Sequence, residues 1–222
     1  MKKILIVMFL CVGIAGWSTP GFARQAIGVG SVPLSVDGSN NGVDITGATT
    51  LLIDNSIEPV PNVDKNNSSL ASVTPAITIN ANDFGQVVFN YNSTIYGDIG
   101  TSGTKLHLIT VSDGMTANFM GNVYAAGAPY GMLVGSGAAN FKSGSTNITA
   151  VDFISDGTIT LAPNTKVIGA LTNNTAGAKK GTLVLGSGSI WDGAVGGAVG
   201  LKAINVTGGS NTAGERDHYR RG

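Results

Sequence analysis

Short runs of alternating apolar and polar residues recur along the chain, separated by Gly, Asn, Asp and Ser. The alternation is clearest in Thr158–Leu161 and in Leu201–Val206, and a period of two residues predicts a strand with one buried and one wet face. From residue 24 onward no window offers ten residues of convincing helical spacing. The predicted strands are Val43–Thr46, Thr50–Ile53, Ala76–Asn80, Gln86–Tyr91, Leu106–Val111, Ala117–Tyr124, Asn147–Ile154, Thr158–Leu161, Thr182–Leu185 and Leu201–Val206.

Internal repeats are the strongest pattern in the sequence. Gly157–Leu161 recurs as Gly181–Leu185 at an offset of 24, and Ala117–Phe119 recurs as Ala139–Phe141 at an offset of 22. Two further similarities, which we call the longer echoes, link more distant segments of the sequence. The first links Gly85–Phe89 with Gly157–Leu161, at three times the longer of those offsets. The second links Ser93–Gly100 with Ser189–Gly196, and each copy is followed by L-x-x-I-x-V, at Leu106 and at Leu201.

One coil of a β-solenoid uses two or three short strands with their turns, and its inward apolar stripe is covered only by stacking on further coils. The repeats therefore predict an all-β fold, a β-solenoid (β-helix) with coils of 22–24 residues. A β-sandwich is the alternative, because it also brings turns every 8–12 residues, although it predicts no internal copy at 24.

The N-terminus has the pattern of a secretory signal peptide. Lys2 and Lys3 precede the apolar stretch Ile4–Gly16, and small residues end the segment at Ala23. We predict cleavage between Ala23 and Arg24, with export by the general secretion machinery. The apolar core is shorter than a membrane span. No second apolar stretch reaches that length, so no span is expected in the mature chain.

We divide the chain into four parts on this basis. Residues 1–23 are the signal peptide, and 24–84 are an N-terminal cap or irregular β region with a loop at 54–75. Residues 85–214 carry the solenoid repeats. Residues 215–222 form an atypical tail, predicted to be disordered, which is either a basic interaction segment or a frameshifted or truncated end of the repeat array. Three of the four arginines, Arg216, Arg220 and Arg221, lie in it.

Composition excludes several classes of protein. Thirteen basic residues balance thirteen acidic ones, so the chain lacks the basic surface that nucleic acid requires. The hydrophobic fraction of 42% excludes a charge-driven disordered chain. The one cysteine, Cys11, lies in the apolar core of the signal peptide. It is a lipid-acceptor candidate only by residue type, since Leu10 occupies the position that a lipobox gives to a small residue.

Few residues indicate catalysis. His107 and His218 are the only histidines, and no G-x-S-x-G or H-E-x-x-H motif accompanies them. Two acidic pairs, Asp152 with Asp156 and Asp98 with Asp192, could serve a polysaccharide-active enzyme or could cap turns. Gly196-Gly197 lacks the aspartate of a calcium-binding tract. We therefore predict no catalytic, cofactor-binding or metal-binding residue, and no enzyme activity.

The aromatic residues Trp191 and Tyr96 occupy nearly matching places in the longer echo. An external aromatic row could bind sugar or a host protein, while an interior row is the commoner arrangement.

The segment from Gly157 to Gly209 contains G-T-I-T-L-A-P-N-T-K-V-I-G, G-T-L-V-L-G-S-G-S-I-W-D-G-A-V-G and L-K-A-I-N-V-T-G-G. It resembles the passenger repeats of rickettsial surface autotransporters, the group of outer-membrane protein A, outer-membrane protein B and the surface-cell antigens. The resemblance implies a β-helical passenger carried to the cell surface by a C-terminal barrel, with a role as adhesin, invasin or coat protein and no catalytic residue to map. This sequence departs from the pattern because it carries no barrel segment.

The expected function is that of an exported bacterial surface protein with a structural or adhesive role, at the cell surface, associated with the outer membrane, or in the periplasm. The expected partners are a host-cell surface protein or glycan, or further copies in a surface layer. Two alternatives remain: an exported polysaccharide-active β-helix enzyme, and a truncated autotransporter remnant without function.

Overall fold

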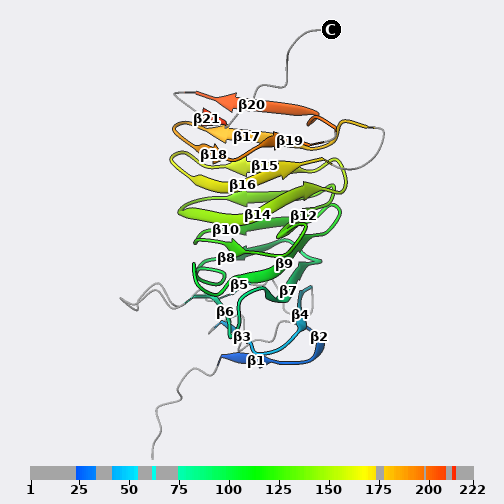
Figure 1. Cartoon of the computed structure of the whole chain (residues 1–222), viewed down its shortest axis with the longest axis vertical. Helices are drawn as coiled ribbons and strands as arrows, with labels where there is room; N and C mark the ends of the chain where they lie inside the picture. The colour runs from blue at the N-terminus through cyan, green and yellow to red at the C-terminus, as the bar shows by residue number, and fades with distance from the viewer. Residues whose placement is uncertain are drawn as a thin grey trace, which may run out of the picture.

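The computed structural model describes residues 24–33, 42–54, 62–63, 75–173, 178–197, 199–208 and 212–213 (Figure 1). Within these ranges the chain contains strands and turns and no helix. Parallel strands stack along one axis, with β1 and β2 at one end and β20 and β21 at the other. The predicted β-solenoid is confirmed. The β-sandwich is wrong, because all of the described strand pairs are parallel.

The strands are β1 (Gln25–Ile27), β2 (Gly30–Pro33), β3 (Val43–Ile45), β4 (Thr49–Ile53), β5 (Asn62–Val63), β6 (Ile77–Ile79), β7 (Phe84–Phe89), β8 (Ser93–Ile95), β9 (Leu106–Val111), β10 (Thr116–Phe119), β11 (Tyr124–Ala125), β12 (Met132–Val134), β13 (Ala138–Phe141), β14 (Ser145–Phe153), β15 (Thr158–Leu161), β16 (Lys166–Thr172), β17 (Thr182–Gly186), β18 (Ile190–Asp192), β19 (Val195–Gly196), β20 (Ala203–Thr207) and β21 (Thr212–Ala213).

Two long sheets form the main faces of the solenoid. The seven-stranded sheet has the order β20-β17-β15-β13-β10-β8-β5. The eleven-stranded sheet has the order β2-β4-β7-β9-β11-β14-β16-β18-β21. Its two further strands are β12, which pairs with β9 and β14, and β19, which pairs with β16. A third, three-stranded sheet of β1, β3 and β6 is continued by single bridges from Ile77 to Ile99 and from Ile99 to Val123. From β4 onward, the described coils therefore pass from the eleven-stranded to the seven-stranded sheet, and the three-stranded sheet or its bridges lead to the next coil as far as Val123.

The two short repeats mark neighbouring coils. Ala117 pairs with Ala139, and Ile159 pairs with Leu183, so in both places the repeat offset equals the length of one coil. The coil between them is shorter, because Ala138 pairs with Thr158. The coil that contains β5 is the longest of those described, because β4 and β7 pair Thr50 with Gln86. The loop predicted at 54–75 falls in this coil, and most of it lies outside the described residues.

The two longer echoes are wrong as structural repeats. Gly85–Phe89 belongs to β7 in the eleven-stranded sheet, whereas Gly157–Leu161 leads into β15 in the seven-stranded sheet. Likewise, β8 and β18 lie in different sheets. The reason is that alternating Val, Ile, Leu and Phe describes any strand that faces the interior, on whichever side of the coil it lies.

Most predicted strands exist, with shifts at their ends. The predicted strand Ala117–Tyr124 is two strands, because β10 ends at Phe119 and the chain turns a corner before β11. Parallel pairing also joins the described strands of the N-terminal region, β1 with β3, β3 with β6, and β2 with β4. The predicted signal peptide at 1–23 and the predicted tail at 215–222 lie outside the described residues. No helix of the described residues has the length and apolarity of a membrane span.

The interior is filled by columns of apolar side chains. One column follows the seven-stranded sheet and contains Ile95, Phe119, Phe141, Leu161 and Leu185, all buried. Burial of each of these side chains contributes about 1.5–3 kcal/mol to the free energy of folding, because it removes apolar surface from water. Because strands of neighbouring coils are about 4.8 Å apart, each side chain packs on its equivalents above and below.

Glycine permits close contact where coils turn. A Cβ atom on Gly137 would lie 2.0 Å from the carbonyl oxygen of Met115, and one on Gly157 would lie 2.1 Å from that of Gly135. These distances exclude any larger residue without displacement of the backbone. The chain has 33 glycines among its 222 residues, and part of this content is therefore required by the stacking of corners.

Candidate functional site

A shallow hollow lies where three coils enter the eleven-stranded sheet. Its volume is about 270 Å³, and it is lined by Ala48, Thr49, Thr50, Asp83, Phe84, Gly85, Gln86 and His107. These residues come from the starts of β4, β7 and β9 or from the turns before them. The lining combines an aromatic ring with a carboxylate, an amide, an imidazole and hydroxyls.

Asp83 and His107 form a pair at this hollow. His107 Nδ1 lies 2.8 Å from Asp83 Oδ1, and both side chains are partly exposed. The turn that holds Asp83 is left-handed at that residue (φ 60°), and the Asp83 amide donates to the carbonyl of Lys105. The pairing fixes the orientation of the imidazole. The nearby hydroxyl of Thr49 is buried and donates to the carbonyl of Gly30, so it is engaged in joining coils.

Three of the four candidate carboxylates are held separately, each by a partner in a neighbouring coil. Asp152 accepts a hydrogen bond from Thr172 Oγ1 at 2.7 Å, and Asp192 pairs with Lys166 Nζ at 2.8 Å. Asp98 accepts from the amide and side chain of Asn122. Asp192 belongs to the eleven-stranded sheet, whereas Asp98 precedes the bridges that continue the three-stranded sheet, so their predicted equivalence is wrong. Groups of three or more His, Cys, Asp or Glu with metal-binding proximity are absent from the described residues.

Asp156, the fourth carboxylate, lies in the exposed turn after β14. Lys202 Nζ lies 2.6 Å from Asp156 Oδ2, and this hydrogen bond, with a smaller contribution from the Gly181 amide, lowers the pKa of the Asp156 carboxyl below its ordinary value of 3.8. The lowered pKa therefore results from a contact that only the fold creates, because the two residues of the pair are 46 positions apart in the sequence.

The two aromatic residues of the predicted row are separated by the fold. Trp191 is fully buried in the interior, where its Nε1 donates to the carbonyl of Gly169 at 2.9 Å. Tyr96 is 49% exposed at the end of β8. The interior interpretation therefore holds for Trp191, and no shared external row exists for this pair.

An array of polar side chains covers the outer face of the seven-stranded sheet. One row consists of Thr94, Asn118, Asn140 and Thr160, which are partners in successive strands. Asn140 Nδ2 donates to Asn118 Oδ1 at 3.0 Å. A parallel row consists of Thr116, Thr158 and Thr182, with the small apolar Ala138 between the first two. We call these two rows the polar face. The sequence analysis did not predict this face. The outward residues of T-I-T at Thr158 and of the two A-N-F strings, which are Thr and Asn, could have indicated it.

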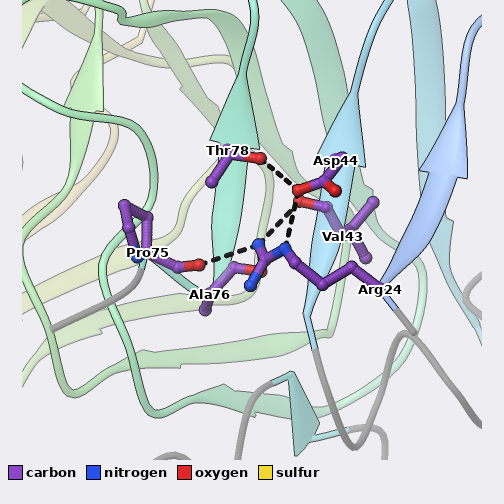
Figure 2. A network of polar contacts seen from close by, with 6 residues as sticks. All are labelled: Arg24, Val43, Asp44, Pro75, Ala76 and Thr78. Atoms are coloured by element: carbon purple, nitrogen blue, oxygen red, sulfur yellow. Dashed lines mark hydrogen bonds and ion pairs between the residues drawn. The ribbon is translucent and has the colours of Figure 1, made fainter. Parts of the chain in front are cut away.

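At the N-terminal end of the described chain, Arg24 joins three segments (Figure 2). Its Nε donates to Asp44 Oδ1 at 2.6 Å, and its Nη2 donates to the carbonyls of Val43, Pro75 and Ala76 at 2.8–3.0 Å. Thr78 Oγ1 also donates to Asp44. The residue predicted to follow the cleavage site therefore fastens the first coil to the next two. Ala23 lies outside the described residues, so the cleavage itself stays a prediction.

No protein-family model matches this chain, and neither the curated proteins nor the solved structures contain a significant match.

Proposed function

We propose that this protein is an exported bacterial surface module with a structural and adhesive role, and that the polar face is its binding surface. The observation that carries the proposal is the alignment of Asn118, Asn140 and Thr160 in successive strands. The signal-peptide pattern and the resemblance to surface passengers support export to the cell surface.

The chemistry of the polar face favours an uncharged ligand with regularly spaced hydroxyls. Thr and Asn supply both donors and acceptors, and the spacing of about 4.8 Å between strands repeats them at a constant interval. An extended neutral polysaccharide presents matching groups along its length. Each contact is weak in water, at about 0.5–1.5 kcal/mol, but several contacts along one chain add.

The test is binding of the full-length chain to a panel of neutral polysaccharides in a sedimentation assay. Thr160→Lys places a charge in the polar face and should weaken binding about tenfold or more. Thr110→Lys is the matched control, because Thr110 faces outward on β9 of the eleven-stranded sheet. Equal binding by both variants and the unaltered chain would contradict the proposal.

A second function, polysaccharide cleavage, is favoured by the Asp83–His107 pair at the hollow. It predicts release of reducing ends from one of the same polysaccharides, and loss of that release in His107→Gln. Binding without release supports adhesion, and release that depends on His107 supports the enzyme.

A further inference from the structure

The last strand of the seven-stranded sheet leaves core positions uncovered. On β20, Ile204 is 48% exposed and Val206 is 57% exposed. Their partners on β17, Leu183 and Leu185, are buried. Ile204 and Val206 therefore continue the inward columns, and the described part of the chain places no further strand over them.

Among the described residues, no strand pairs with the outer edge of β20. Exposed strand edges in natural proteins usually carry proline, a charged residue or a bulge that prevents pairing with another chain. Ala203–Thr207 contains none of the first two, and β20 pairs with β17 in unbroken register. The neighbouring Lys202 is directed to Asp156. The edge is thus suited to pairing with another strand.

The residues that follow β20 in this sequence have the wrong chemistry to cover it. Residues 208–222 contain no Ile, Leu, Val, Phe or Met, and 215–222 are mostly charged or polar. Burial of two branched apolar side chains requires apolar partners.

The opposite end of the solenoid is also a poor complement. Its first described strand in the seven-stranded sheet, β5, has two residues against the five of β20. The end strand β2 of the other long sheet contains Pro33, which has no N–H to donate. A head-to-tail continuation would leave most of β20 unpaired.

We propose that β20 pairs with β20 of a second copy of this chain, joining two solenoids end to end about a twofold axis. A twofold axis at Asn205 makes the two strands antiparallel and places Ile204 of each copy opposite Val206 of the other. Residues directly opposite in an antiparallel pair lie on the same face, so both pairs close the two open columns at once. Such an isologous contact is self-complementary and ends at the dimer. The inference is independent of the proposed adhesive function.

The first experiment measures the mass of the full-length chain by light scattering or sedimentation over a range of concentrations. We expect a concentration-dependent rise from 22.4 kDa, less any signal peptide removed, to twice that mass. The double variant Ile204→Lys/Val206→Lys buries unpaired charges in the contact and should raise the dissociation constant about 100-fold. The control is the double variant Thr158→Lys/Thr160→Lys, which changes the outer side of β15 and should leave the dimer intact.

A second experiment locates the contact by cross-linking in a Cys11→Ala background. Asn205→Cys should form an intermolecular disulfide, because directly opposite residues of antiparallel strands have Cα separations within the range that disulfides require. Val184→Cys is the matched control, since Val184 is the partner of Asn205 one strand deeper and its edges are already paired.

A chain that stays monomeric at all concentrations, a dimer that survives the Ile204→Lys/Val206→Lys change, or equal cross-linking of both cysteines would overturn the proposal. Open-ended polymers would also overturn it, because a twofold contact cannot propagate.

Discussion

At the scale of single residues, stability depends on how each inward side chain fits its equivalents in the coils above and below. Phe119 illustrates this most directly. Its ring meets Phe89 edge-on at 5.6 Å between centroids and stacks on Phe141 at 5.2 Å. The three rings link both long sheets across the interior, since Phe89 lies on β7 and the other two lie on β10 and β13.

We expect Phe119→Ala to lower the free energy of unfolding by about 3–5 kcal/mol, because it removes buried area and leaves a cavity between two rings. The neighbouring Met120 is 38% exposed, and Met120→Ala should change the free energy by less than about 0.5 kcal/mol. Denaturant unfolding of both variants measures the contrast. A similar loss in the two would show that the stacked rings carry no special weight.

The Asp156–Lys202 pair makes stability depend on pH. Its hydrogen bond lowers the pKa of Asp156 in the folded chain, so its stabilising effect is complete above about pH 4 and is lost as the pH falls through the lowered value. The effect is small because both side chains are about half exposed.

We expect Asp156→Asn to reduce the loss of stability between pH 5 and pH 2.5, measured as the shift of the denaturation midpoint. Lys202→Gln should reduce it similarly, and the double variant should add nothing further. If the two single changes add in the double variant, the residues do not act as a pair.

At the scale of the element, the corners are held by side chains that bind the backbone of the next coil. Asp98 accepts from the amide of Asn122 at 2.6 Å, and Asn122 Oδ1 in turn accepts from the amide of Ser145 at 2.7 Å. The side chain of one corner thus fixes the start of the following strand. Turn residues chosen for their local propensity acquire a second role, which is to set the register between coils.

Asn122→Ala should lower the free energy of unfolding by about 1–2 kcal/mol, because it removes the acceptor for Ser145 and one donor to Asp98. Ser102→Ala, in an exposed corner, serves as the control. Thermal or denaturant unfolding measures both, and an equal effect would place the stabilisation elsewhere in the corner.

The sequence predicted where most strands lie, but it did not predict which sheet of the solenoid each strand joins. Alternation in Thr158–Leu161 and Thr182–Leu185 predicted both strands, and their repeat offset predicted their pairing, because the two strands pair in unbroken register at that same offset. The same alternation in Gly85–Phe89 suggested a false equivalence, since inward-facing residues are similar in every sheet. Among the strands that were missed, β12 is three residues long and glycine interrupts β16, so neither shows a clear alternation.

At the scale of the whole molecule, each coil packs only on its neighbours, so stability is a sum of coil and interface contributions. An interior strand such as β15 has partners on both sides, β13 and β17, whereas β20 has one described partner. The ends should therefore open more readily than the middle.

Hydrogen exchange measured by mass spectrometry should show this gradient. In the Ile204→Lys/Val206→Lys variant we expect the amides of β20 to exchange fastest and those of β15 slowest. In the unaltered chain at high concentration β20 should gain protection. Uniform exchange along the chain in a single step would contradict a coil-by-coil opening.

The candidate sites depended on contacts that no local pattern reveals. Asp83 and His107 come together because β7 and β9 pair in neighbouring coils. Arg24 reaches carbonyls 51 and 52 residues away, beyond the long coil that contains β5. The export, surface location and adhesive role stay predictions from the leader pattern and the resemblance.

The sequence by itself determined that this chain forms strands, that every second residue of each strand faces inward, and that the strands repeat at about the length of one coil. These properties are local, since they follow from alternation and from turn residues. Only the tertiary structure decided which side of the solenoid each strand occupies, which polar side chains align on the outside, and that Ile204 and Val206 are exposed on the last described strand of the seven-stranded sheet. The reason is that coil length varies along the solenoid, and each change in length alters which residues become neighbours.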